Sequence, residues 1–106
     1  MKPEEVKDLI LSCLEEKKAE NIFVHKYSHN SYIFDHAIIA SGRSTRNASA
    51  IADYIAYTLK HKGLHVNIKG LKTGEWVLLD CCGVITHIFH PEVREYYNIE
   101  EILQKH

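Results

Sequence analysis

Residues 36–63 read HAIIASGRSTRNASAIADYIAYTLKHKG. The first five, His36 to Ala40, contain a continuous apolar run, which is typical of a strand buried on both faces, so they form our candidate central strand. Gly42 then permits a bend, and the apolar side chains after it recur at helical spacing as far as Gly63. A strand, a glycine bend and a long helix make the front half of a βαβ unit. A right-handed crossover therefore predicts a parallel return strand at His65 to Lys69.

The segment after this unit predicts a β-hairpin. A turn at Lys72 to Gly74 leads into an apolar stretch from Trp76 to Cys81. Gly83 permits a second turn, and Val84 to Phe89 then provides the paired strand.

The remaining segments predict helices at both ends of the chain. An amphipathic helix begins near the amino terminus and ends near Lys18, and a short strand, Ile22 to Tyr27, follows it before a polar turn at Ser28 to Ser31. Pro91 stops the hairpin, and Pro91 to Tyr97 followed by Ile99 to Gln104 predicts one or two short terminal helices. We therefore expect one α/β domain over residues 1–106, with a mixed β-sheet and flanking helices.

Composition restricts the possible functions. The 106 residues suit a single core, and thirteen basic against fourteen acidic side chains leave a net charge of -1. That charge does not provide the broad phosphate attraction of a stand-alone nucleic-acid binder, so we expect little direct nucleic-acid contact and docking on a protein component of any RNA machine. The sequence shows neither a signal peptide nor a long apolar run, which favours a cytoplasmic location and no membrane association.

Cysteine and histidine spacing predicts neither disulfides nor a metal site. Three cysteines without C-x-x-C spacing indicate reduced thiols. His61 and His65 are separated by Gly63, which looks like a helix terminator, and His87 and His90 fall on opposite faces if both lie in a strand. We expect no metal and no cofactor.

Five motifs, in register along nearly the whole chain, resemble those of the ribosomal silencing factor family (Iojap-like, RsfS). These are Asp35 with the apolar strand into Ser41-Gly42-Arg43-Ser44-Thr45-Arg46, Ala50-Ile51-Ala52-Asp53, Gly74-Glu75-Trp76-Val77-Leu78-Leu79-Asp80, His87-Ile88-Phe89, and Pro91-Glu92-Val93-Arg94-Glu95-Tyr96-Tyr97.

The resemblance implies a nucleotidyltransferase-like topology and a non-enzymatic role. It implies binding to the large ribosomal subunit, through a ribosomal protein at the intersubunit face, and inhibition of subunit joining, which lowers translation when nutrients are scarce. The chain departs from the family pattern at Cys81-Cys82-Gly83, where the family usually has an aromatic residue or leucine, then glycine, then an acidic or small residue. It also has Arg43 where the family usually has a small polar residue.

The residues that we expect to bind the partner lie mainly on the hairpin. Trp76 alone is more simply a core tryptophan, but the resemblance makes it the preferred anchor. Leu78 and Asp80 share its face by the two-residue period. His87 could contact the partner or pair with Asp80 across the hairpin, and the sequence leaves both readings open, as it does the outward face. The full predicted set is Trp76, Leu78, Asp80, Cys81, His87, Phe89 and Arg94. In the free protein this surface could also form a homodimer.

The helix start offers an alternative function, phosphate or nucleotide binding related to the nucleotidyltransferases. Gly42, Ser44, Thr45 and Arg46 could hold a phosphate at free backbone amides, or the hydroxyls could simply cap the helix. Metal-dependent nucleotidyl transfer is rejected, because the strand His65 to Lys69 carries no carboxylate. Cys81, Cys82 and His87 likewise lack the base, orienting residue and oxyanion hole that nucleophilic hydrolysis needs. We therefore expect no catalytic residues.

Overall fold

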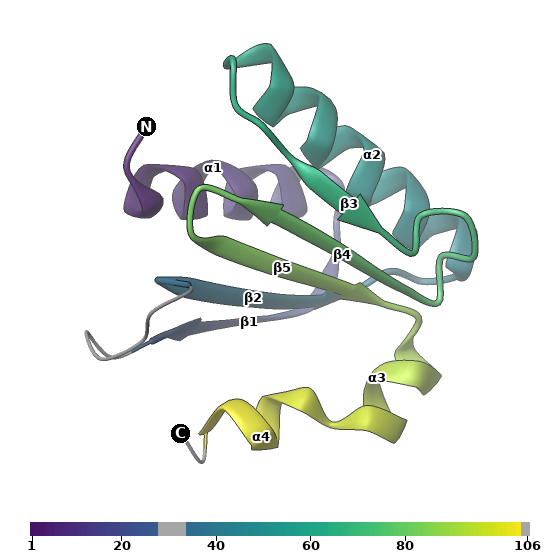
Figure 1. The fold of residues 1–106 in the computed structure, drawn as a ribbon. Coiled ribbons are helices and arrows are strands. Elements are labelled where there is room, and N and C mark those ends of the chain that lie inside the picture. Colours follow the sequence, from purple (N-terminus) through teal and green to yellow (C-terminus); the bar gives the residue numbers. More distant parts are fainter. Residues whose placement is uncertain (28–33, 105–106) are drawn as a thin grey trace.

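The computed structural model describes residues 1–27 and 34–104, which form a mixed five-stranded sheet with helices on both of its faces (Figure 1). The strands are β1 (Glu20–Lys26), β2 (His36–Ser41), β3 (Asn67–Lys69), β4 (Trp76–Cys81) and β5 (Val84–Phe89). The helices are α1 (Pro3–Glu16), α2 (Thr45–His61), α3 (Pro91–Tyr97) and α4 (Ile99–Gln104). The predicted α/β class, the hairpin and both terminal helices are confirmed, whereas the predicted turn at Ser28 to Ser31 lies outside the described residues. No helix in the described ranges has the length and apolar character that a membrane span requires.

The sheet order is β1-β2-β5-β4-β3, which corrects one prediction. Strand β2 is an interior strand with all six residues buried, but β5 rather than β2 occupies the middle of the sheet. The two strands are parallel, with His36 beside Val84 and Ser41 beside Phe89. The hairpin therefore docks on β2 through β5, a long-range pairing that the local sequence pattern does not specify.

Strand β3 is shorter than predicted and lies at the sheet edge. It pairs only with β4, antiparallel, and β4 is antiparallel to β5. Because β5 is parallel to β2, β3 runs in the same direction as β2, as the crossover rule predicts. The hairpin strands β5 and β4 separate the two, so the return strand is parallel to β2 without being its neighbour.

The main core lies between the sheet and the pair α1 and α2, which cover one face (Figure 1). Both helices bury residues at helical spacing against inward-pointing residues of β2, β4 and β5. The largest of the fully buried side chains in this layer are Ile10, Leu14, Ile38, Ile51, Ile55, Leu59, Leu79 and Ile88. Complete burial of each aliphatic side chain of this size contributes about 1.5–3 kcal/mol to folding.

Helices α3 and α4 lie on the opposite face of the sheet (Figure 1) and are held more loosely. Their main contacts with the sheet are those of α3 with β5 and of α4 with β1. Helix α3 begins with Pro91 after the cap His90, and Asn98 in a left-handed conformation separates it from α4. Helix α3 has no fully buried residue. These helices therefore cover only part of the second face.

Candidate functional site

The two faces of the hairpin differ in exposure. Val77, Leu79 and Cys81 of β4 are buried toward α1 and α2, whereas Trp76 and the residues that alternate with it are only partly buried. This alternation corrects the prediction for Cys81, which is 2% exposed in the core and has no surface for a partner. At the hairpin tip the exposed thiol is that of Cys82.

Cross-strand register groups six side chains on the second face. Trp76 lies opposite Phe89, Leu78 opposite His87, and Asp80 opposite Ile85. In antiparallel pairs, side chains directly opposite one another point to the same face and interact. The structure therefore brings the predicted residues Trp76, Leu78, Asp80, His87 and Phe89 together.

Phe89 forms the base of an aromatic cluster. Its ring is fully buried and stacks on the indole of Trp76, with centroids 4.9 Å apart and planes at 30°. Tyr97 of α3 approaches the same indole at 4.9 Å and 45°. The indole is thus neither an enclosed core residue nor free on the surface, since the rings of Phe89 and Tyr97 contact it while part of it stays exposed.

A hydrogen bond fixes the orientation of the indole. The Trp76 Nε1 donates to His87 Nδ1 over 3.0 Å. Burial of the imidazole lowers the pKa of His87 to about 4, so the ring is neutral at physiological pH and Nδ1 carries the lone pair that accepts this bond. The hydrogen-bond partner of His87 is thus Trp76, which was not predicted from the sequence. The predicted pairing with Asp80 is wrong, because Asp80 lies opposite Ile85.

Two glycines place Trp76 at the start of its strand. Gly70 and Gly74 both have positive φ, and the turn between them closes with a backbone hydrogen bond from Gly74 to Gly70. A Cβ on Gly70 would collide with the Trp76 carbonyl, and one on Gly74 would collide with the Thr45 carbonyl of α2. The turn is therefore packed tightly against both the indole residue and the helix start.

A hollow of about 370 Å³ lies on the second face, beside the aromatic cluster. Leu78 and Ile85 supply apolar walls, and Asp80 and Lys69 supply opposite charges. The remaining lining residues are Phe34, Asn67 and Ile68. An apolar floor with a few charged groups is the usual composition of a binding surface on a protein.

Arg94 has a structural position instead of a free one. Its Nε donates to Glu100 over 2.6 Å and its terminal nitrogen donates to Ser41 Oγ over 2.8 Å. The side chain is 12% exposed. The guanidinium therefore joins α3 to α4 and to β2, and it is not free to contact a partner.

The helix start at residues 42–46 favours the capping interpretation. Ser44 Oγ accepts a hydrogen bond from the Asn47 amide over 3.0 Å, and Asn47 Oδ1 accepts one from the Arg43 amide over 2.9 Å. These reciprocal bonds occupy amides that a phosphate would need. Thr45 is the first helical residue, and Arg46 is exposed. Within residues 1–27 and 34–104, no three His, Cys, Asp or Glu side chains are grouped to bind a metal ion.

Ile85 and Phe34 were not predicted to contribute to this surface, and Tyr97, predicted only as a possible rim residue, was not predicted to contact Trp76. Ile85 could have been found, because the two-residue period places it with His87 and Phe89. Tyr97 could not, since its contact with Trp76 depends on how α3 docks on the sheet. The same holds for Phe34, which precedes β2 and lines the hollow through tertiary packing.

Comparisons with known proteins give a consistent result over the whole chain. A family model described as "Ribosomal silencing factor during starvation" matches residues 1–106. A relative named ribosomal silencing factor RsfS, from Zymomonas mobilis, is 39% identical over 101 residues, covering 94% of this chain and 76% of the relative. A mouse protein named mitochondrial assembly of ribosomal large subunit protein 1 is 29% identical, covering 90% of this chain and 43% of its own. The crystal structure of a Chromobacterium violaceum protein superposes with a TM-score of 0.93 at 33% identity, covering 98% of this chain and 88% of that one.

Proposed function

Because the chain belongs to the ribosomal silencing factor family, we propose that it binds the large ribosomal subunit through a ribosomal protein at the intersubunit face. By occupying that face in the cytoplasm it blocks association with the small subunit and represses translation, especially under nutrient limitation. The observation that carries this proposal is the ordered aromatic cluster of Trp76, His87, Phe89 and Tyr97 beside a hollow of about 370 Å³.

This arrangement is suited to competition with another large surface. A standard interface covers about 800 Å² on each partner and gains most of its affinity from a few aromatic or arginine anchors. Trp76 is stacked on one side and hydrogen-bonded at its nitrogen before any partner arrives. The entropy cost of ordering it has therefore already been met by folding.

The proposed action is occupancy and not catalysis. The family and the Zymomonas mobilis relative are named for silencing, a regulatory role rather than an enzymatic one. Nothing in the mechanism consumes a nucleotide or needs a metal ion, so a chelator that leaves the subunits intact should not relieve the inhibition. A nucleotide requirement for binding would contradict this mechanism.

The test combines a subunit-joining assay with two matched variants. Wild-type protein should co-sediment with isolated large subunits at near one-to-one stoichiometry and reduce their joining to small subunits. Trp76→Ala should weaken binding by at least about 2 kcal/mol, roughly thirtyfold, because that loss defines an anchor residue. Tyr54→Ala is the control, since Tyr54 is also a partly buried aromatic with one side-chain bond, to Glu16 at 2.6 Å, but lies on α2 in the other layer.

Thermal melting of the same samples separates contact from folding. The proposal requires that Trp76→Ala remain folded and lose both binding and inhibition, while Tyr54→Ala keeps both. Normal subunit joining at saturating wild-type protein would refute the function. Unchanged binding by folded Trp76→Ala would remove the aromatic cluster from the interface.

A further inference from the structure

The charge of the protein is unevenly distributed. The whole chain has thirteen Lys and Arg and fourteen Asp and Glu, but residues 43–72 contain six of the basic residues and a single acidic one, Asp53. The rest of the chain therefore holds seven basic and thirteen acidic residues. The net charge of -1 conceals one strongly basic segment and an acidic remainder.

All six basic side chains of this segment are exposed. They are Arg43, Arg46, Lys60, Lys62, Lys69 and Lys72. Within the part of the chain that the structure describes, none of them forms an ion pair, whereas Lys7 of α1 pairs with both Glu4 and Asp8. Their charge is thus not neutralised by the protein itself.

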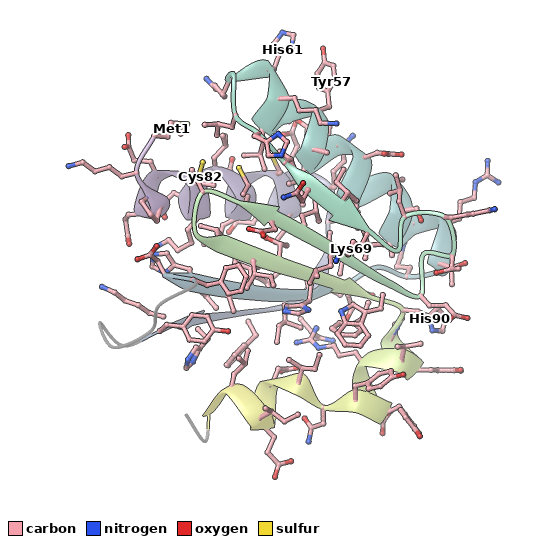
Figure 2. All side chains as sticks on the ribbon, in the orientation of Figure 1. Met1, Tyr57, His61, Lys69, Cys82 and His90 are labelled. Atoms are coloured by element: carbon pink, nitrogen blue, oxygen red, sulfur yellow. The ribbon has the colours of Figure 1, made fainter. Side chains whose placement is uncertain are left out.

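Folding brings five of these residues, all except Lys69, to one edge of the molecule. The turn that carries Lys72 packs on the first part of α2, where Ser49 Oγ donates to the Leu71 carbonyl over 2.7 Å. Lys72 is therefore close to the helix end that carries Arg43 and Arg46. Lys60 and Lys62 mark the other end of α2, which at 17 residues is about 25 Å long. Lys69 lies on β3, the edge strand (Figure 2), but it lines the hollow of the second face and is not part of this edge.

An exposed aromatic pair lies among these cations. Tyr57 stacks on His61 with centroids 5.1 Å apart and planes at 25°, and Tyr57 is 63% exposed. Figure 2 shows both side chains projecting from α2 away from the sheet. A flat ring beside unpaired cations is a composition that suits nucleic acid, because rings stack on bases and cations contact phosphates.

We propose that this surface, the edge formed by α2 and the turn at Lys72 with its five cations and Tyr57, contacts ribosomal RNA phosphates. The inference rests on the proposed function, since a ribosomal protein exposed on the large subunit is bordered by RNA. It also assigns separate roles to two surfaces: the aromatic cluster binds the protein partner and the edge binds the adjoining RNA. The acidic remainder disfavours non-specific RNA binding and turns the edge toward the subunit during approach.

The first experiment measures how binding to large subunits depends on salt at constant magnesium. The edge variant combines Arg46→Gln, Lys60→Gln, Lys62→Gln and Lys72→Gln. Each phosphate contact contributes about -0.9 to the slope of log affinity against log salt, so the edge variant should have a slope flatter by about 3 to 4.

The control variant neutralises four exposed lysines outside the edge. It combines Lys2→Gln, Lys17→Gln, Lys18→Gln and Lys26→Gln, all exposed. The net charge falls by four in both variants, so a general charge effect would act equally on them. The control should keep a slope close to that of the wild-type protein, and equal slopes in all three proteins would overturn the proposal.

The second experiment identifies the molecule at the edge. A photoreactive benzophenone amino acid at position 57 should cross-link to nuclease-sensitive material when the protein is bound to large subunits. Cross-links to protein alone would assign the edge to an acidic protein and overturn the RNA assignment.

A third experiment measures RNA binding without ribosomes, so that failure of this inference can be told apart from failure of the proposed function. Wild-type and control proteins should bind a short RNA duplex weakly at low salt, and the edge variant should not. If wild-type protein fails to bind large subunits, the proposed function fails, and duplex binding that depends on the edge still supports an RNA surface. Equal duplex binding by all three proteins would refute it.

Discussion

The Trp76–His87 hydrogen bond should be measurable as a coupling energy in folding. Trp76→Phe keeps an aromatic ring against Phe89 but removes the indole N–H, which leaves His87 Nδ1 without its donor in an environment where the imidazole is only 9% exposed. An acceptor left unsatisfied in a buried position costs about 1–3 kcal/mol. Trp76→Phe should therefore destabilise the protein by that amount, beyond the small loss of ring area.

The partner substitution, His87→Leu, should cost less through the hydrogen bond. Trp76 is only partly buried, so water can reach its freed Nε1, and we expect a loss of about 0.5–1.5 kcal/mol. The double variant replaces both polar partners with apolar groups. Its loss should be smaller than the sum of the single losses by about 1 kcal/mol, which is the coupling energy of the pair.

Urea unfolding of the four proteins at pH 7.5 provides the free energies, with thermal melting as a second measurement. For a domain of 106 residues, 1 kcal/mol corresponds to about 4–6 °C in the melting temperature. Additive losses, with no coupling beyond experimental error, would refute the hydrogen bond as the element that orders the indole. A change in the slope of unfolding against urea would instead indicate an altered denatured state.

Two further predictions concern folding stability. Burial lowers the pKa of His87 from 6.5 to about 4, so between these pH values the unfolded chain binds a proton that the folded protein does not. The free energy of unfolding should therefore be complete above pH 6.5 and fall by about 3 kcal/mol as the pH drops toward 4. Urea unfolding of His87→Leu should lack this part of the pH dependence. Gly74→Ala should destabilise the protein more than Gly63→Ala, because both glycines have positive φ but only at Gly74 would a Cβ collide with α2. Gly63 faces open space, so Gly63→Ala should lose about 1 kcal/mol of unfolding free energy. Equal losses of the two variants in denaturant unfolding would show that the turn moves away from α2 at no energetic cost.

The elements were predictable where local signals agree. Glycine turns and the apolar stretches between them predicted both hairpin strands with the bounds found in the structure, and Pro91 marked the start of α3. Sheet order was not predictable in the same way, because pairing of β5 with β2 joins residues almost fifty positions apart. Apolar residues occur on both faces of β5, so its pattern does not indicate which neighbours it takes.

The candidate surface shows the same division. The alternation that groups Trp76, Leu78 and Asp80 also places Cys81 on the opposite face, so its burial could have been inferred from the sequence. The contact between Trp76 and Tyr97 could not, because it depends on the angle at which α3 packs. Arg94 helps to join α3 to the sheet, since its two hydrogen bonds reach β2 and α4.

Net charge is a poor guide to partners when the charges are segregated along the fold. The chain total of -1 predicts little contact with nucleic acid, and that reasoning holds for a protein approaching RNA from any direction. A protein held in one orientation by an aromatic anchor presents a single edge, however, and only the charges on that edge then determine the local attraction. Because screening limits exposed charges to about 8–10 Å, the acidic remainder on other sides weakens this attraction very little. The aromatic anchor and the basic edge can therefore act together in binding. Neither the total charge nor the hairpin sequence alone indicates this combined binding.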